Sequence, residues 1–176
     1  MSNKLFFLIL TTILSVPVLS FSSYATHKQP LYRSSFHTIK TAGNPQLPSF
    51  PLYDINGAKT DLLNFKGKKL FVNIWASWCP PCRREMPSIE QLYQSVDTGK
   101  VAFVLIAYDN RFETAKRFME GKNWHLPIYY PAGIMPKLFD VPGIPVTFIF
   151  DEKGELIQQI EGGENYNTKE YKALLN

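Results

Sequence analysis

The sequence predicts an α/β domain, in which a central mixed β-sheet is flanked by helices in a three-layer sandwich. Two short apolar runs, residues 70–75 and 101–108, are each followed by a segment whose apolar residues recur every three or four positions. A strand, a helix and a second strand in this order favour parallel pairing through a right-handed crossover. Near the C-terminus, residues 146–151 and 155–161 flank Glu152–Lys153–Gly154, which predicts an antiparallel hairpin and therefore a mixed sheet.

The first half of the domain is expected to contain a hairpin, a helical turn, a strand and a long helix. Phe50, Leu52 and Ile55 lead into the turn-like Asn56–Gly57, which is typical of a short N-terminal β-hairpin. Asp61 can cap a helical turn that follows it directly. The apolar run at 70–75 predicts a buried central strand, and the helix after it is expected to end at Gly99.

The second half continues the alternation of strands and helices. Asp109 or Asn110 is expected to cap a helix that Gly121 closes, because short polar side chains suit the first position of a helix and glycine suits its end. The expected elements are a strand at 101–108, a helix at 112–119, a short strand at 126–130, a short helix at 134–139 and a terminal helix at 168–175.

The composition fits one folded domain with a substantial core. The chain has 176 residues, of which 45% are hydrophobic and 14% aromatic, too apolar for a disordered protein. Its net charge is only +4, and the basic residues occur in pairs, without the dense basic stripe that nucleic-acid binding needs. We therefore expect no nucleic-acid partner, and we expect a monomer, because no segment is long enough for a separate dimerisation domain.

The N-terminus has the pattern of a secretory signal peptide. Lys4 precedes an apolar run at residues 5–14, and small residues occupy the positions that a signal peptidase reads, Ser23 and Ala25. We expect residues 1–25 to be removed from an exported protein, with an uncleaved membrane anchor over residues 5–21 as the alternative. Residues 26–47 are polar and proline-containing, which predicts a flexible tether before a domain at 48–176.

The two cysteines, Cys79 and Cys82, predict redox chemistry. A disulfide between them would close a very small loop, and small loops gain little stability from cross-linking. The pair follows a strand and opens a helix, where unpaired backbone N–H groups stabilise a thiolate, so Cys79 is expected to be the nucleophile. Cys82 lies on the same helix face and would resolve the mixed disulfide, while Pro80 and Pro81 suit a first turn that lacks N–H partners.

Other uses of the cysteines fit the sequence less well. A zinc site needs about four ligands, and only three histidines could join the two cysteines, two of them in the predicted tether. Covalent haem attachment needs a histidine directly after the second cysteine, where Arg83 stands. We therefore expect no metal and no cofactor other than the cysteine pair, and a purely structural disulfide remains the alternative.

The segment at 75–87, Trp-Ala-Ser-Trp-Cys-Pro-Pro-Cys-Arg-Arg-Glu-Met-Pro, resembles the active site of the thioredoxin superfamily. It is most similar to the exported branch called TlpA-like or ResA-like, and the segment from Gly143 to Phe148 fits the same branch. The resemblance covers residues 47–175. It implies a thioredoxin-like sandwich and a thiol–disulfide oxidoreductase whose partners are protein thiols and disulfides.

The resemblance also implies roles for residues around the cysteines. Pro145 matches a proline that is cis in this superfamily and lies beside the cysteine pair, which would leave the backbone of Ile144 free to bind a substrate strand. Trp78, Pro80 and Pro81 would border the substrate-binding surface. These assignments come from the matching positions alone.

Two polar residues bear on proton transfer. Glu85 matches an acidic residue proposed to assist proton transfer in ResA-like proteins, although a helix dipole alone also favours glutamate near a helix start. Asn73 occupies the place where cytosolic thioredoxins carry a buried aspartate, and an amide cannot ionise. This departure moves the expected base for Cys82 to Glu85 or to water.

The resemblance implies a reductant of exported proteins, for example of apocytochrome c during cytochrome c maturation. A membrane thiol-electron transporter would be its electron donor. The same residues leave open a disulfide-forming oxidase and a non-enzymatic redox-regulated binding or chaperone module. A peroxide-reducing enzyme of the same fold would need its nucleophilic cysteine in a different local context.

Overall fold

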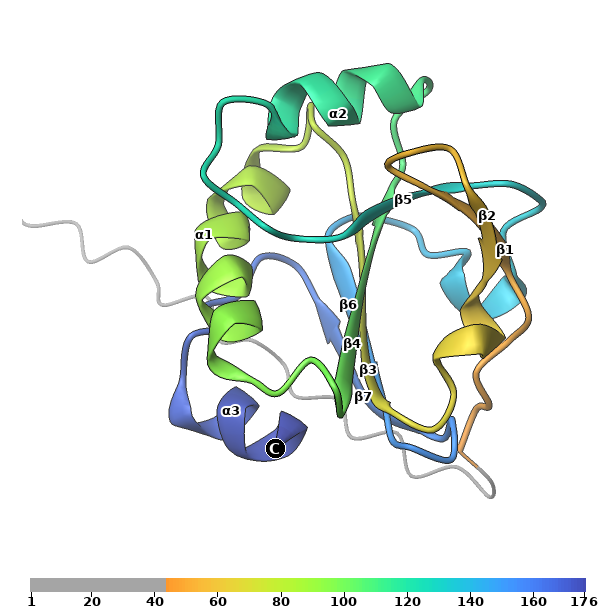
Figure 1. Cartoon of the computed structure of the whole chain (residues 1–176), viewed down its shortest axis with the longest axis vertical. Coiled ribbons are helices and arrows are strands. Elements are labelled where there is room, and N and C mark those ends of the chain that lie inside the picture. Colours follow the sequence, from red (N-terminus) through yellow and green to blue (C-terminus); the bar gives the residue numbers. More distant parts are fainter. Residues whose placement is uncertain (1–43) are drawn as a thin grey trace, which may run out of the picture. The chain divides into compact units, whose positions relative to one another are not determined.

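The computed structural model describes residues 44–176, which form a seven-stranded sheet with helices against it (Figure 1). The strands are β1 (Pro51–Asp54), β2 (Lys59–Asp61), β3 (Lys69–Trp75), β4 (Val101–Ala107), β5 (Ile128–Pro131), β6 (Val146–Phe150) and β7 (Leu156–Glu161). The helices are α1 (Pro80–Ser95), α2 (Phe112–Met119) and α3 (Lys169–Leu175), together with the 3-10 helices η1 (Leu62–Phe65) and η2 (Lys137–Phe139).

The sheet is mixed, as the sequence predicts. Its strand order is β2-β1-β5-β4-β3-β6-β7, with β3 parallel to β4 and antiparallel to β6. The crossover through α1 joins the parallel pair, and β6 and β7 form the predicted C-terminal hairpin. The expected N-terminal hairpin is β1 paired with β2, and the carboxylate of Asp61 caps η1 by accepting from the backbone N–H of Leu63 at 2.9 Å.

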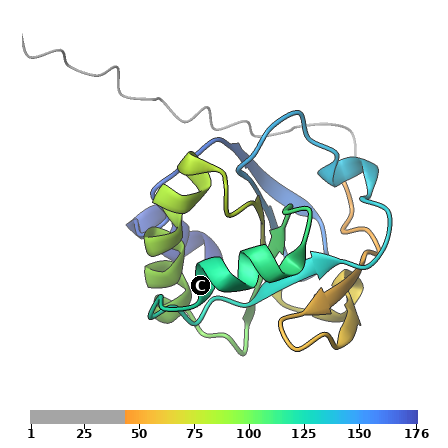
Figure 2. The same cartoon turned by 90° about the horizontal axis from the view of Figure 1, so that it is seen from above.

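The sheet separates two apolar cores. Alternate residues of β3 face opposite sides, so that Phe71 and Trp75 belong to the core beneath the α-helices and Val72 belongs to the other. Helices α1 and α3 lie on one side, and η1 and η2 lie on the other (Figures 1 and 2). This arrangement confirms the predicted α/β sandwich.

The end of α1 and the start of α2 differ from the expectations. Helix α1 ends at Ser95 and not at Gly99, because Val96 is extended and the carboxylate of Asp97 accepts from Gly99 N at 2.9 Å to form a separate turn. Neither Asp109 nor Asn110 caps α2, which begins after Arg111 without a side-chain cap.

Three further boundaries are shifted. The short helix expected at 134–139 is reduced to η2 at 137–139, because Pro136 favours an extended residue before it. Strand β5 covers 128–131, against the expected 126–130. Ordered contacts begin before residue 48, since Pro45 O accepts from Leu156 N and Leu47 N donates to Gly154 O, each at 2.8 Å. Pro45 and Leu47, which the prediction placed in the tether, therefore belong to the folded domain.

The signal peptide predicted at residues 1–25, the alternative anchor at 5–21 and the tether up to residue 43 lie outside the described residues. Among residues 44–176, no helix has the length and apolar character needed to cross a membrane.

Candidate active site

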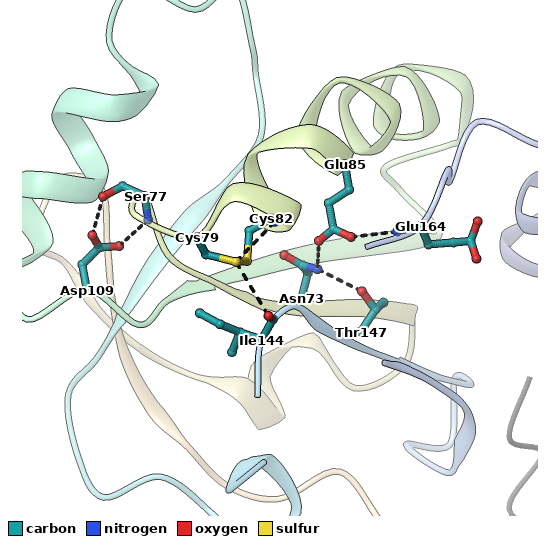
Figure 3. The surroundings of a disulfide bond; sticks show 9 residues. All are labelled: Asn73, Ser77, Cys79, Cys82, Glu85, Asp109, Ile144, Thr147 and Glu164. Carbon is teal, nitrogen blue, oxygen red and sulfur yellow. Dashed lines mark hydrogen bonds between the residues drawn. A yellow bond between two sulfur atoms is a disulfide. The ribbon is translucent and has the colours of Figure 1, made fainter. Parts of the chain in front are cut away.

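The cysteine pair lies where β3 ends and α1 begins (Figure 3). Cys79 is the N-cap of α1, and its Sγ accepts a hydrogen bond from Cys82 N at 3.3 Å. The two residues form a disulfide with their Cα atoms 5.3 Å apart. Pro80 and Pro81 occupy the first turn, so the expected placement of the pair at a helix N-terminus is confirmed.

The two sulfurs differ in access. Cys79 keeps 3% of its surface exposed and Cys82 none, while the neighbouring Trp78 is 62% exposed. Of the two cysteines, Cys79 is therefore the one that keeps some contact with solvent, and the exposed Trp78 directly precedes it. The burial of Cys82 suits a thiol that reacts only within the protein.

The loop before β6 completes the surface around Cys79. The Ile144–Pro145 peptide bond is cis, as the resemblance implies, and Pro145 is buried. The carbonyl oxygen of Ile144 lies 3.7 Å from Cys79 Sγ (Figure 3). Fixing this loop, Gly162 N donates to Pro145 O at 2.9 Å. The structure thus brings Cys79, Ile144 and Pro145 together from distant parts of the chain.

Glu85 is buried beneath the pair, with only 2% of its surface exposed. Its carboxyl group accepts from Asn73 Nδ2 at 2.9 Å and from Glu164 N at 3.2 Å. Burial raises the pKa of Glu85 to about 8, and the two hydrogen bonds lower it only in part. Glu85 is therefore mostly uncharged at neutral pH. It is not a solvated glutamate of the kind that a helix dipole alone would favour.

Asn73 organises the polar groups under the site. Its amide nitrogen also donates to Thr147 Oγ1 at 2.9 Å, and Tyr166 Oη donates to the same oxygen at 2.6 Å. Burial raises the pKa of the Tyr166 hydroxyl well above its ordinary value, and the nearby Glu85 adds to this shift. In place of an ionisable aspartate, the chain therefore has an amide that holds Glu85 by hydrogen bonding.

Asp109 fixes the loop that carries the cysteines. This buried carboxylate accepts from Ser77 N at 3.0 Å and from Ser77 Oγ at 2.5 Å (Figure 3). Because β3 and β4 are parallel, the residues after both strands meet at the same edge, and Tyr108 N donates to Trp75 O at 2.7 Å there. Asp109, one of the two residues expected to cap α2, thus holds the loop that carries the cysteines.

Sequence reasoning missed Thr147, Glu164, Tyr166 and Asp109. The first three contact the site from positions far along the chain, and no local pattern distinguishes them from ordinary core or loop residues. The proline segment at 143–148 was the only available signal, since it includes Thr147.

The family model described as Redoxin matches residues 41–175 of the chain. The chain belongs to the Redoxin family. Two curated relatives agree. Thiol-disulfide oxidoreductase ResA of Bacillus thuringiensis is 32% identical over 71% of this chain and 71% of its own length. Thioredoxin-like protein YneN of Bacillus subtilis is 36% identical over 67% of this chain and 70% of its own.

A solved structure of similar fold supports the same assignment within the Redoxin family. It is a thiol:disulfide interchange protein of the thioredoxin family from Chlorobium tepidum, with a TM-score of 0.63 and 26% identity. The match covers 77% of this chain and 99% of that one. The expected membership of the ResA-like thioredoxins is therefore confirmed, and this Redoxin protein is a thiol–disulfide oxidoreductase whose working group is the Cys79–Cys82 disulfide.

The other predicted site residues border the disulfide. Pro80 is exposed and Pro81 half-buried. A Cβ atom on Gly163 would lie 3.4 Å from Pro81 Cβ, so the loop after β7 passes close to the first turn of α1. Within the described part of the chain, no three His, Cys, Asp or Glu side chains are grouped to hold a metal ion.

Proposed function

We propose that the protein is an exported reductant that reduces disulfides of other proteins outside the cytoplasm. A membrane thiol-electron transporter would return the pair to its dithiol form, and apocytochrome c is the expected client. The electron donor and the client are taken from the family resemblance. The names of the relatives state thiol–disulfide exchange but name no client. The signal-like pattern of residues 1–25 supports the proposal of export.

The observation that carries the reductant direction is the surroundings of Cys79 Sγ. Strong disulfide-forming oxidants stabilise the reduced form by stabilising its thiolate. Here the sulfur accepts one backbone hydrogen bond, from Cys82 N, and faces the carbonyl oxygen of Ile144 at 3.7 Å. A carbonyl oxygen and burial both disfavour a thiolate, so the reduced pair is not strongly favoured and readily gives up its electrons.

The first step follows from the exposure of the sulfurs. The thiolate of Cys79 attacks one sulfur of a substrate disulfide, the substrate S–S bond breaks, and the other substrate sulfur leaves as a thiolate. We expect Trp78, Pro80, Pro81 and the backbone of Ile144 to contact the substrate at this stage. The product is a mixed disulfide between Cys79 and the substrate.

The second step needs Cys82 to lose its proton inside the protein. In the minority of molecules in which Glu85 is ionised at neutral pH, its carboxylate accepts this proton. The thiolate of Cys82 then attacks Cys79 Sγ, and the second substrate sulfur leaves as a thiolate. Two electrons have then passed from the cysteine pair to the substrate, which becomes a dithiol. Because burial raises the pKa of Glu85 to about 8, close to the ordinary thiol value of about 8.5, the proton passes between them at little free-energy cost.

The test is the reduction potential of the Cys79–Cys82 pair. The protein is equilibrated with glutathione or dithiothreitol buffers, and free thiols are scored by alkylation. A potential at or below about −230 mV supports the reductant. A potential near about −120 mV would contradict it, because that value belongs to proteins that make disulfides. Binding of partners that survives Cys79→Ser without any turnover would instead favour a redox-regulated binding module.

A further inference from the structure

A basic groove runs along α1 directly beside the cysteine pair. It has a volume of about 420 Å³. Its lining residues come from α1 and from the segment around the end of α2: Pro80, Arg83, Arg84, Pro87, Phe118, Lys122 and Trp124. The four α1 residues lie on one face of the helix, away from the buried face that carries Cys82 and Glu85. The groove therefore begins at the residue after Cys79 and continues outward along the helix.

The groove combines cations with aromatic rings and contains no acidic residue. The guanidinium of Arg83 lies 5.4 Å from the ring centre of Phe118. Lys122 Nζ lies 5.7 Å from the ring centres of both Phe118 and Trp124. Neither ion pair found among residues 44–176 involves Arg83, Arg84 or Lys122. Three positive charges thus face solvent over an apolar floor.

A buried carboxylate fixes the position of one wall of this groove. Glu90 on α1 accepts from His125 N at 2.9 Å and lies 3.1 Å from His125 Nδ1. Gln94 Nε2 also donates to Glu90, at 2.6 Å. Because His125 directly follows Trp124, these contacts hold the aromatic wall of the groove against α1, and little ordering remains to be done when a ligand enters.

We propose that the groove docks an acidic segment of the protein whose cysteine reacts with Cys79. Carboxylates of that segment pair with Arg84, Lys122 and the Arg83 guanidinium, and its apolar side chains cover Phe118 and Trp124. Arginine suits this role because its planar fork binds a carboxylate through two hydrogen bonds. The proposal rests on the thiol–disulfide exchange with other proteins proposed above. It adds that the partner carries negative charge beside its reactive cysteine.

The experiment compares two peptides of equal length on the full chain. In one, glutamates follow a single cysteine; in the other, glutamines do. Each cysteine carries a chromophoric thiol in a disulfide, and attack by reduced Cys79 releases the chromophore. We expect the acidic peptide to react about threefold to tenfold faster at low salt, as a few exposed charge pairs would give. This ratio should approach one near 1 M salt.

The variant Arg84→Gln/Lys122→Gln should abolish the preference. The matched control is Lys59→Gln/Lys66→Gln, which removes the same charge from exposed positions on the hairpin side of the sheet and should keep the ratio. Equal rates for both peptides in the parent protein, or a preference that survives in Arg84→Gln/Lys122→Gln, would overturn the docking surface. Loss of the preference in Lys59→Gln/Lys66→Gln as well would also overturn the docking surface, because it would show that the preference depends on net charge alone.

Two other occupants would give different results. Binding to vesicles of phosphatidylglycerol that Arg84→Gln/Lys122→Gln abolishes, without a peptide preference, would assign the groove to a membrane surface and overturn the proposal. If the parent protein self-associates, the same variant does not, and the parent shows no preference for the acidic peptide, the groove would bind a second copy of the chain. This result would also overturn the proposal. The ratio of the two peptide rates does not depend on the reduction potential. The potential therefore tests whether the protein is a reductant, and the ratio separately tests whether the groove is a docking surface.

Discussion

Replacing Glu85 by glutamine should change how stability depends on pH. Glutamine keeps the size of the side chain, but its single oxygen can accept only one of the two hydrogen bonds that Asn73 and Glu164 donate to separate carboxyl oxygens. It cannot ionise, and it therefore resembles the protonated carboxyl group. The variant should be less stable than the parent at pH 5, by about 1–3 kcal/mol for the lost hydrogen bond, and it should lose less stability than the parent between pH 5 and pH 8.

The magnitude follows from the pKa of this carboxyl group. In the folded protein its pKa is raised from 4.5 to about 8, chiefly by burial. Between these values the folded state holds a proton that the unfolded chain has released, so stability falls as pH rises. From pH 5 to pH 8 the loss is about 3 kcal/mol, obtained from about 1.4 kcal/mol per pH unit. The residue is only 2% exposed, so solvent screening does not reduce this figure.

Urea unfolding of the oxidised protein, followed by circular dichroism at several pH values, measures the effect. The useful quantity is the unfolding free energy of Glu85→Gln minus that of the parent, because other titrating groups cancel. It should rise by about 3 kcal/mol between pH 5 and pH 8.

The control for this measurement is Glu113→Gln. Glu113 is an exposed residue of α2, 3.2 Å from Lys116 Nζ, and the difference for this variant should stay nearly constant with pH. A constant difference for Glu85→Gln as well would refute the reasoning. It would mean that the folded protein holds this carboxyl group ionised.

Four further substitutions test the site. Cys79→Ser should abolish reduction of disulfides, whereas Cys82→Ser should accumulate a mixed disulfide that non-reducing gels detect, and the opposite pattern would exchange the two roles. Thr147→Val removes the acceptor of one Asn73 N–H and should lower the unfolding free energy by about 1–3 kcal/mol, measured in urea. Asn73→Asp places a second carboxyl beside Glu85 and should make stability fall more steeply with pH than in the parent, because two adjacent carboxylates repel. An unchanged slope would show that the two groups do not interact.

The elements that determine the fold could be predicted from the sequence because their signals are local. The apolar run at 70–75 marked the central strand, and the two cysteines marked the helix start after it. Assignment of the cis bond before Pro145 needed the family resemblance, since many prolines that open a strand are trans. Export and the tether remain predictions.

The surroundings of the site could not be predicted because they depend on pairing between distant segments. A short acidic side chain after a strand can cap the next helix or bind a neighbouring loop, and only the parallel pairing of β3 and β4 decides that Asp109 holds Ser77. Likewise, Glu85 gives no sign in the sequence that it is buried. Its partners Asn73 and Glu164 lie 12 and 79 residues away along the chain.

The contacts at Pro45 have a consequence for how the domain meets other molecules. Strand β6 begins beside the site and runs to the turn that binds Pro45 and Leu47, so the described chain starts about a strand's length, roughly 17 Å, from the reactive sulfur. Lys69 Nζ, at that same pole, donates to the backbone oxygens of Leu174 and Asn176. Both described ends therefore leave from the pole opposite the cysteines (Figure 1). A label or a surface attached at either end would leave the reactive pole open to an approaching protein.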